Sequence, residues 1–506
     1  MRRPFRAGAV TAIVLLAGCN LGPDYHRPAL EMPAIYRASQ ATEAAAWPAA
    51  DWWRGFDSSE LNELIDEARV RNFDIAAAIA RVVQADAQVR IAGAALLPTL
   101  DATGSGGWQH IGLASGGNSS GSGSRIGGRS GNASIDTHSY SAALNVAYEL
   151  DFWGKNRAAR QAAVATAMFS RFDQQTVALT VVTNVANTWF TALALADRMQ
   201  VAEQNLADAE QTLSVIRGRM DAGTATALDL AQQEALVAGE RATIPNFRNQ
   251  IEQELLGLGI LVGRPPEAIT ARPGTLTALS LPLVTAGLPS ELLARRPDVA
   301  SAEAQLIAAN FDIKVARAAF FPSIQLTGQG GFSGAALNAL FFPGGTIASL
   351  SAGLTQPIFD AGTLRGQLEQ AKGRYDELLA DYRKAVVQAL TDVEDALTAW
   401  RYTTEQEALE AQAVATAQRA ADIARAQLIA GTVDITTVLQ AETTLFNDQD
   451  ILAQVRLTRF QALLNLYKAL GGGWTESPRP IPDQFPGLSP GVLKGGVALP
   501  VGGNIQ

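Results

Sequence analysis

The chain contains two copies of one long pattern, each about half its length. The Leu-Pro-Thr of residues 97–99 returns as the Phe-Pro-Ser of 321–323, at an offset of 224 residues. Farther along, the Ala-Gly-Thr of 222–224 returns unchanged at 430–432, at an offset of 208. The smaller second offset means that the first half has extra residues between these two motifs. They fall in a Gly/Ser-rich stretch, 116–131, which has the composition of a surface loop. A repeat this long predicts two equivalent half-chain units and not a stack of small modules.

Each unit has a period-two segment after its proline. Apolar side chains alternate with small polar ones over 98–150 and again over 322–359. This alternation predicts a β-hairpin with one apolar face in each half. No charged side chain occurs from Ala318 to Phe359. The polar face of a soluble sandwich, which is the alternative, normally carries Lys or Glu over such a length, so strands facing lipid are favoured.

Four strands of about ten residues suit a tilted bilayer crossing but cannot close into a barrel. Open sheet edges in hydrocarbon would leave backbone N–H and C=O groups without hydrogen-bond partners. The barrel is therefore expected to be assembled from several chains. Two copies would give a filled interior, so a water-filled passage indicates three or more.

The remainder of each half is predicted to be a long helical hairpin. Residues 154–262 turn at Gly223, and residues 362–470 turn at Gly431. Glycine suits the left-handed cap that ends a helix, and a following Thr or Asp suits the N-cap of the next one. The fold class is an α+β membrane protein with a two-fold internal repeat. Its expected divisions are a signal peptide (1–18), a first repeat (58–262), a second repeat (291–471), and a small mixed equatorial region from 19–57, 263–290 and 472–506.

The N-terminus has the features of a secreted lipoprotein. Three arginines within residues 1–6 precede a mostly apolar stretch, 7–17, which leads to the Leu-Ala-Gly-Cys of 16–19. The apolar run is too short to span a membrane, so we expect cleavage before Cys19 and acylation of its thiol. A free cysteine is the alternative. Asn20 follows the cysteine where Asp would favour retention in the inner membrane, so sorting to the outer membrane is expected.

Composition leaves little material for catalysis or nucleic-acid binding. The formal net charge is -9 and the basic residues are scattered, which argues against a nucleic-acid groove. One Cys and three His give few metal ligands, and we expect no cofactor beyond the lipid. Ser119 fits the spelling of a nucleophile elbow, but it lies in the Gly/Ser-rich stretch without a strand-to-helix turn.

Two further groups of side chains in the first hairpin are candidates for minor roles. His110 and His138 flank the same loop and could meet, although without a carboxylate partner such residues are more often polar loop residues. Three aromatic residues could form an interfacial belt or could pack against the helices: Trp108, Tyr148 and Trp153.

Three motifs and the twin turns together resemble a known family. They are Cys-Asn-Leu-Gly-Pro-Asp-Tyr-His-Arg-Pro at 19–28, Trp-Trp-Arg-Gly-Phe at 52–56 and Arg-Arg-Pro-Asp-Val at 295–299. With the two Ala-Gly-Thr turns, they are similar to the outer membrane factors, the TolC-like channels, and most closely to the lipoprotein branch that includes OprM and the NodT-type factors. The resemblance covers essentially the whole mature chain.

The resemblance implies a homotrimer whose twelve-stranded β-barrel is continuous with a twelve-helix periplasmic α-barrel. A periplasmic adaptor and an inner-membrane pump would dock to it, the adaptor at the hairpin tips formed by Gly223, Thr224, Gly431 and Thr432. In the family, acidic residues often ring the constricted end; the matching positions here hold Thr437 and Gln440. Asp229, the first-half equivalent of Thr437, and Asp434 are the alternative gate residues. An ordinary solvated carboxylate near a helix N-terminus is an equally good interpretation of Asp229.

The resulting functional hypothesis is an outer-membrane exit duct of a tripartite efflux system, with an RND-type pump, that passively conducts small toxic compounds. The duct would be lipid-anchored, would span the outer membrane in contact with its lipids, and would keep most of its mass in the periplasm. A type I secretion channel is an alternative. A lipid-anchored structural coiled-coil protein and a cell-wall hydrolase that uses Ser119 are others.

Overall fold

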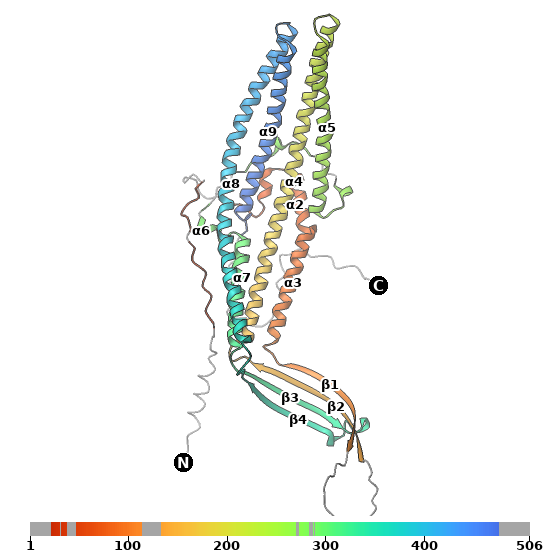
Figure 1. Cartoon of the computed structure of the whole chain (residues 1–506), viewed down its shortest axis with the longest axis vertical. Helices are drawn as coiled ribbons and strands as arrows, with labels where there is room; N and C mark the ends of the chain where they lie inside the picture. The colour runs from red at the N-terminus through yellow and green to blue at the C-terminus, as the bar shows by residue number, and fades with distance from the viewer. Residues whose placement is uncertain are drawn as a thin grey trace, which may run out of the picture. The chain divides into compact units, whose positions relative to one another are not determined.

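The computed structural model describes residues 22–30, 32–37, 47–113, 133–269, 273–282, 287 and 289–474. The chain divides into two compact units, which are described separately. One unit holds Met1–Arg27, Gln84–Ala167 and Gln305–Leu378, and the other holds Pro28–Val83, Met168–Ala304 and Leu379–Gln506. Figure 1 shows the strands of the first unit and the long helices of the second.

The first unit contains a four-stranded antiparallel sheet with strand order β1-β2-β3-β4. The strands are β1 (Thr99–Leu113), β2 (Ala133–Leu150), β3 (Ser323–Gly334) and β4 (Thr346–Thr355). Each half of the chain thus supplies one β-hairpin, as the alternation predicted. Both outer strands, β1 and β4, have a free edge within the part of the chain that the structure describes.

The register of the sheet separates an apolar face from a polar face. Directly opposite residues share a face, and Leu100, Val146, Gly328 and Leu350 lie in one row across the four strands. The large apolar side chains exposed on this face are Leu100, Trp108, Leu144, Val146, Leu350 and Leu354. No element among the described residues covers these exposed apolar side chains, which is the pattern of strands in contact with lipid.

The opposite face of the sheet carries hydroxyls and amides that bond across the strands. The hydroxyl oxygens of Ser105 and Ser141 are 2.8 Å apart, and the Asn145 amide donates to the Thr103 hydroxyl at 2.9 Å. These hydrogen bonds between uncharged side chains order the polar face. That face is suited to line a water-filled passage.

The first two strands are longer than the ten residues expected. Residues 133–139 of β2 pair only with β1, so this end of the β1–β2 hairpin extends beyond the four-stranded part of the sheet as a two-stranded ribbon. Short 3-10 turns at Leu337–Ala339 and Pro343–Gly345 end the β3–β4 hairpin sooner. A ribbon with unpaired edges cannot lie in hydrocarbon, which places this end of the hairpin in the aqueous or headgroup region.

Trp153, a candidate for the aromatic belt, packs inside the first unit instead. Its indole Nε1 donates to the Pro322 carbonyl at 2.7 Å, and its ring stacks on Phe321 at a centroid distance of 4.8 Å. This contact joins the end of the first hairpin to the start of the second. Of the three candidate belt residues, Trp153 thus packs within the unit, whereas Trp108 is exposed.

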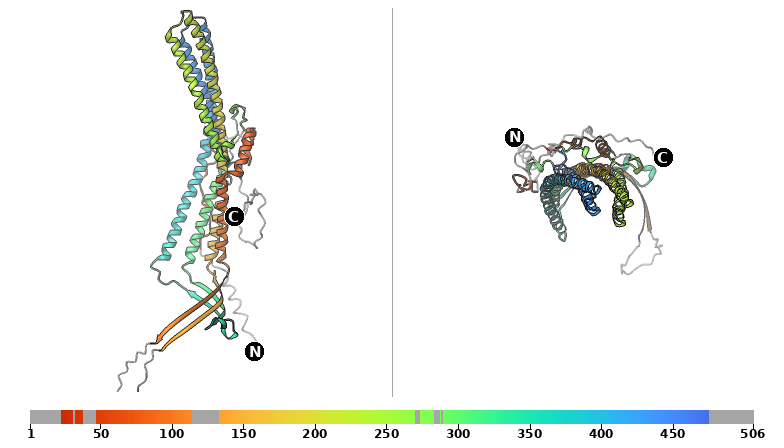
Figure 2. Two further views of the ribbon diagram at one scale, coloured as in Figure 1. Left: turned by 90° about the vertical axis from the view of Figure 1, so that its right-hand side faces the viewer. Right: turned by 90° about the horizontal axis from the view of Figure 1, so that it is seen from above.

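The helices follow the predicted hairpins closely. The first hairpin is α4 (Lys155–Asp221) with α5 (Ala227–Val262), and the second is α8 (Thr363–Ile429) with α9 (Ile435–Ala469). In the second unit the two hairpins lie side by side in both views of Figure 2. The other elements are η1 (Trp52–Phe56), α2 (Ser59–Arg71), α3 (Phe73–Ala94), η2 (Pro266–Ala268), η3 (Leu276–Ala278), α6 (Pro289–Leu292) and α7 (Pro297–Ala318).

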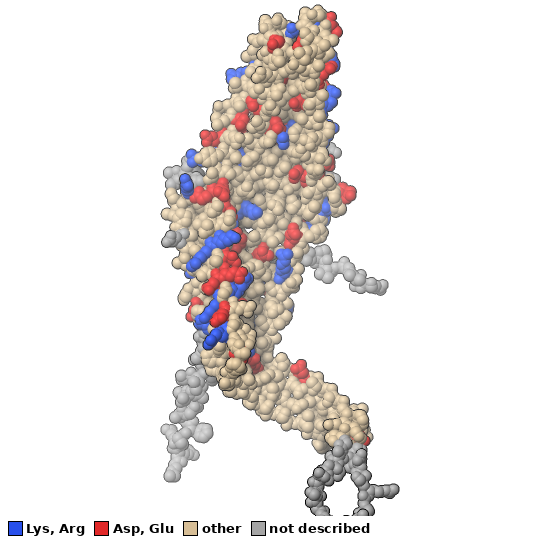
Figure 3. Space-filling view, viewed as in Figure 1, with Lys and Arg blue, Asp and Glu red and all other residues tan. Residues whose placement is uncertain are grey.

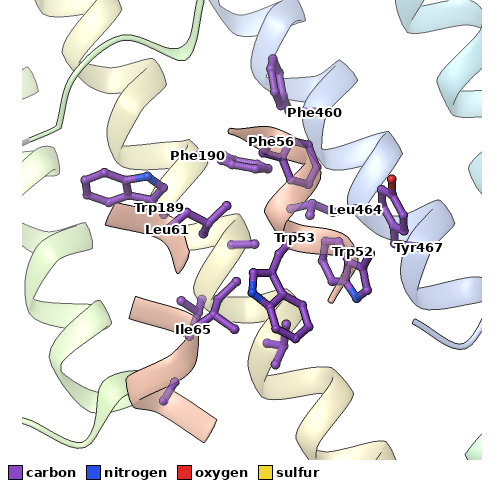
Figure 4. Close-up of a cluster of buried hydrophobic side chains, with 14 of the residues drawn as sticks. Trp52, Trp53, Phe56, Leu61, Ile65, Trp189, Phe190, Phe460, Leu464 and Tyr467 are labelled. Atoms are coloured by element: carbon purple, nitrogen blue, oxygen red, sulfur yellow. The ribbon is translucent and has the colours of Figure 1, made fainter. Parts of the chain in front are cut away.

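An aromatic cluster fastens the N-terminal segment to the helices of the second unit (Figure 4). Trp52 stacks on Tyr467 at a centroid distance of 4.6 Å, and Phe56, which is fully buried, lies 4.9 Å from Phe190. The Arg-Arg-Pro-Asp motif has a similar anchoring role. The Arg296 guanidinium binds Asp298 at 2.6 Å, Asp392 at 2.9 Å and the carbonyl of Ala469 at 3.2 Å. The motifs at 52–56 and 295–299 therefore hold the helices of this unit together.

Candidate functional site: the tips of the helical hairpins

The two Ala-Gly-Thr turns have nearly the same geometry. Gly223 and Gly431 adopt φ angles of +73° and +74°, which L side chains rarely take. The amide of Thr224 donates to the Arg219 carbonyl at 2.8 Å, and that of Thr432 donates to the Gln427 carbonyl at 2.9 Å. These are the six-to-one bonds of a Schellman motif, which satisfy carbonyls left free at the end of a helix. The sequence repeat is thus a structural repeat.

The turns are exposed to solvent. Thr224 and Thr432 lie on the surface, and a Cβ added at Gly223 or Gly431 would meet no atom within 4 Å. Both threonine hydroxyls donate back to the last turn of their helix, at 3.0 and 3.1 Å. The tips are therefore well-ordered surfaces that a partner could approach without displacing any of the described residues.

Asp229 and Asp434 act locally at the starts of the returning helices. Asp229 accepts the amide of Thr226 at 2.7 Å while the Thr226 hydroxyl accepts the amide of Asp229, which is a capping box. Asp434 is the N-cap of α9 and accepts both the hydroxyl of Thr437, at 2.7 Å, and its amide, at 3.0 Å. These hydrogen bonds from the Thr437 side chain and backbone lower the pKa of Asp434.

Thr437 and Gln440 line a groove between the two helices of the second hairpin. This groove has a volume of about 380 Å³ and is lined by Ala417, Ala420, Asp434, Thr436, Thr437, Gln440, Ala441 and Thr444. Three of the four candidate gate residues are thereby brought together: Asp434, Thr437 and Gln440. Asp229 is not among the lining residues. Apart from the Asp434 carboxylate, the groove is lined by small or neutral side chains. It is therefore suited to contact another surface and not to catalyse a reaction.

A buried ionic cluster, which the sequence analysis missed, ties the two hairpins together near the tips. Arg425 of α8 donates from Nε to Glu442 Oε1 of α9 at 2.8 Å and from Nη2 to Asp208 Oδ2 of α4 at 3.2 Å. The Thr212 hydroxyl of α4 also donates to Glu442 Oε1, at 2.7 Å. Glu442 is fully buried. A buried carboxylate persists only with such partners, so the cluster fixes how the hairpins meet.

Two more contacts reinforce this seam between the hairpins. Arg198 of α4 forms a two-pronged ion pair with Asp450 of α9, at 2.6 and 3.0 Å. Nearer the tip, Arg219 Nη1 donates to the Leu428 carbonyl at 2.7 Å. The offset of 208 residues, which relates Arg217 to Arg425 and Glu234 to Glu442, was the signal that could have revealed the cluster.

The remaining candidate residues form no catalytic arrangement among the described residues. His110 Nδ1 is 2.7 Å from Asp136 Oδ1, whereas His138 lies opposite Trp108. His110 therefore has a carboxylate partner, which the sequence analysis did not anticipate. Within the described ranges, no group of three or more His, Cys, Asp or Glu side chains could hold a metal ion. Cys19 and Ser119 lie outside the described residues.

Charge is distributed very unevenly over the surface. On the face seen in Figure 3, acidic and basic side chains gather over the helices, whereas the strands carry few of them. The sheet edges and the hairpin tips therefore differ in what they can contact. The sheet offers an apolar face with open backbone edges, and the tips offer polar turns.

Comparisons with known proteins agree with this organisation. A family model described as outer membrane efflux protein matches residues 64–264 and 288–472. The chain is 39% identical over 465 residues to the pyoverdine export outer membrane protein OpmQ of Pseudomonas aeruginosa, covering 92% of this chain and 96% of that protein. It is 35% identical over 476 residues to the probable efflux pump outer membrane protein TtgC of Pseudomonas putida, covering 92% and 95%. The solved outer-membrane channel OprN superposes with a TM-score of 0.81 at 25% identity, covering 90% of this chain and all of that one.

Proposed function

The chain belongs to the outer membrane efflux protein family, and we propose that it is the outer-membrane exit channel of a tripartite efflux system. In this role it conducts small compounds from the periplasm to the outside. It acts after docking to a periplasmic adaptor and an inner-membrane pump of the RND type. The channel itself is passive and carries out no catalytic step.

The observation that carries this proposal is the two-faced sheet with two open edges. The face that carries Leu100 and Leu350 points outward, and the face that carries Ser105 and Asn145 points to the opposite side. A membrane strand alternates lipid-facing and lumen-facing side chains in this way. Because the edges of β1 and β4 need partners in hydrocarbon, three chains pool their strands into a homotrimeric, twelve-stranded barrel.

We assign adaptor docking to the hairpin tips and passage control to the residues just behind them. Gly223, Thr224, Gly431 and Thr432 are exposed on rigid turns. Behind them, each chain contributes Asp229, Asp434, Thr437 and Gln440. Two of these four are neutral, so the constriction carries fewer negative charges than a fully acidic ring and selects cations weakly.

The proposed lipid on Cys19 would hold the N-terminal segment at the membrane. A single acyl chain binds only reversibly, and additional chains make the attachment stable. Labelling cells with a radioactive or clickable palmitate should mark the wild-type protein and leave Cys19→Ala unlabelled. Label on the Cys19→Ala protein would contradict this assignment.

The cargo follows from the pump more than from this chain. OpmQ is named for pyoverdine export and TtgC for an efflux pump, so a small molecule is favoured over a polypeptide, which a type I secretion channel would carry. The test is accumulation of a fluorescent pump substrate in a deletion strain. Wild-type protein should restore export. A variant with Thr224→Lys and Thr432→Lys should form trimers normally but fail to restore export. Full export by that variant would overturn the docking assignment, and no defect in the deletion strain would overturn the function.

A further inference from the structure

The apolar face of the sheet changes in character along the β1–β2 hairpin. It starts with Leu100 and ends with two cross-strand pairs, Trp108 opposite His138 and His110 opposite Asp136. These residues share one face, because side chains two apart along a strand, and those directly opposite across it, point to the same side. The hairpin therefore presents aliphatic, then aromatic, then ionisable side chains on the face assigned to lipid.

This order matches the depth profile of a bilayer. Helix α3 ends at Ala94 and β1 begins at Thr99, so β1 starts on the helical side, which the proposed function places in the periplasm. At a rise of about 3.4 Å per residue and a tilt of about 40°, Trp108 lies roughly 21 Å above Leu100, and His110 lies roughly 26 Å above it. The apolar band of a membrane barrel is about 25 Å tall. Trp108 is thus placed at its outer boundary and His110 at the level of the outer headgroups.

Only β1 and β2 reach this level among the described strands. Residues 133–139 of β2 pair with β1 and not with β3, and the β3–β4 hairpin ends earlier (Figure 2). Trp108 is 65% exposed, and the side chains of His110 and Asp136 are about half exposed. His138 is exposed as well. No described element covers this end of the face, so it is open to the membrane surface.

The geometry of the two pairs provides donors for an anion. His110 Nδ1 is 2.7 Å from Asp136 Oδ1, and the imidazole lies beside Trp108 with ring centroids 6.1 Å apart. When this imidazole is protonated, Nδ1–H donates to Asp136 and Nε2–H is left to donate to a second anion. His138 is the diagonal neighbour of His110 across the two strands, at a typical separation of about 7–8 Å. Two imidazoles at this spacing can donate to different oxygens of one phosphate group.

We propose that Trp108, His110, Asp136 and His138, called the ribbon patch below, bind the phosphate group of lipid headgroups in the outer leaflet. Trp108 contacts the boundary between acyl chains and headgroups, where an amphipathic ring is favoured. The histidines donate to the phosphate oxygens. The occupant is a lipid and not free phosphate, because the ribbon patch continues the lipid-facing side of the sheet. The inference rests on the proposed function, which supplies the orientation of the hairpin in the outer membrane.

Phosphate binding by the ribbon patch should strengthen as the pH falls. Imidazoles become charged between about pH 8 and pH 5, and each charged imidazole donates a stronger hydrogen bond to an anion. Asp136 is the only carboxylate within residues 107–111 and 135–140, and neither β3 nor β4 has a charged side chain. Two imidazolium charges against one carboxylate leave a net charge of +1 on the protonated patch.

Counting the lipids bound to the full-length protein tests this assignment. The trimer, purified in mild detergent, is titrated with lipid A that carries both of its phosphates and with the same lipid after both are removed. Native mass spectrometry measures the bound lipid at about pH 6 and about pH 8. The wild type should bind the phosphorylated lipid roughly tenfold more tightly at the lower pH, and most of this preference should disappear at the higher pH. An excess of inorganic phosphate should displace little of the lipid.

The variant with His110→Gln and His138→Gln supplies the baseline, because the lipid phosphate itself changes charge over this pH range. Its preference for the phosphorylated lipid should be roughly tenfold smaller than that of the wild type at about pH 6 and should vary little with pH. An unchanged preference in this variant would overturn the inference. Complete displacement of the lipid by inorganic phosphate would overturn the assignment of a lipid as the occupant.

A matched control moves both imidazoles to the other face at nearly the same depth. Gln109 and Thr137 lie opposite each other on the polar face, next to His110 and His138. The variant with Gln109→His, His110→Gln, Thr137→His and His138→Thr keeps the composition and should bind lipid like the double glutamine variant, because neighbouring residues of a strand point to opposite faces. Wild-type lipid binding by this variant would contradict the role of the outer face.

The lipid experiment and the proposed function can fail separately. A wild-type trimer that restores export but binds both forms of the lipid equally would overturn the ribbon patch and leave the exit channel standing. Absence of any trimer, together with normal export in the deletion strain, would instead remove the proposed function.

Discussion

Replacing one lipid-facing leucine by arginine should be far more damaging than the same change at the adjacent residue. Leu350 lies near the middle of β4, is 86% exposed and shares the apolar face of the sheet. Its neighbour Ser349 lies on the polar face, opposite Gln329. The pair Leu350→Arg and Ser349→Arg thus places the same charge at nearly the same depth but on opposite sides of the barrel wall.

The size of the effect follows from the geometry of the strand. Ten residues at a rise of about 3.4 Å and a tilt of about 40° cover roughly 26 Å of depth, close to the apolar band of an outer-membrane barrel. Leu350 therefore sits near the bilayer midplane. An arginine facing lipid there costs about 2–4 kcal/mol per chain, and one facing the lumen costs close to zero. The first value corresponds to a roughly 30- to 1000-fold shift of the folding equilibrium.

The measurement is urea-induced unfolding in liposomes, together with the amount of heat-modifiable trimer in outer membranes. Leu350→Arg should lower the unfolding free energy and the trimer yield strongly, and Ser349→Arg should resemble the wild type. Equal losses from both variants, or a larger loss from Ser349→Arg, would refute the assignment of the two faces.

Three further predictions concern the helical unit. Phe56→Ala removes a fully buried ring that packs on Phe190 and Phe460, so it should reduce the free energy of unfolding by about 3–5 kcal/mol in a denaturant titration, whereas Arg54→Ala, at an exposed residue of the same turn, should change it little. Arg425→Ala leaves the buried Glu442 carboxylate without its ion pair and should cost about 3 kcal/mol of local stability, seen as faster hydrogen exchange in the last turns of α8; exchange equal to that of the wild type would contradict the role of the cluster. The lowered pKa of Asp434 means that its capping contribution is complete above the ordinary carboxyl pKa and is lost as the pH falls through the lower folded-state pKa, so exchange at the start of α9 should accelerate below about pH 4 in the wild type, and Asp434→Asn should lack this acid-induced step.

Sequence reasoning predicted the architecture because the architecture is repeated and periodic. Glycine at 223 and 431 marks both helical turns, since each needs a positive φ angle. The alternation around Leu144 and Leu350 identifies the apolar face without any knowledge of the partner strands. Features that depend on local backbone geometry and on hydrophobic periodicity can be predicted from the sequence of one chain.

The parts that sequence reasoning missed depend on which surfaces meet. Glu442 looks identical to Glu234 by position in the repeat, but only Glu442 is buried, because the second hairpin turns that face toward α4. The pairing of His110 with Asp136 required the strand register. Neither the burial of Glu442 nor the pairing of His110 with Asp136 can be predicted from the spacing of residues within a single helix or strand.

The central claim is that each polypeptide supplies an open sheet which becomes a barrel only by joining with identical chains. Native mass spectrometry of the protein extracted from outer membranes in mild detergent measures this directly. The account predicts one dominant species with three copies of the chain, which falls to monomers when the sheet is denatured by heating. A folded single-copy species that keeps its β-structure in a bilayer would contradict it.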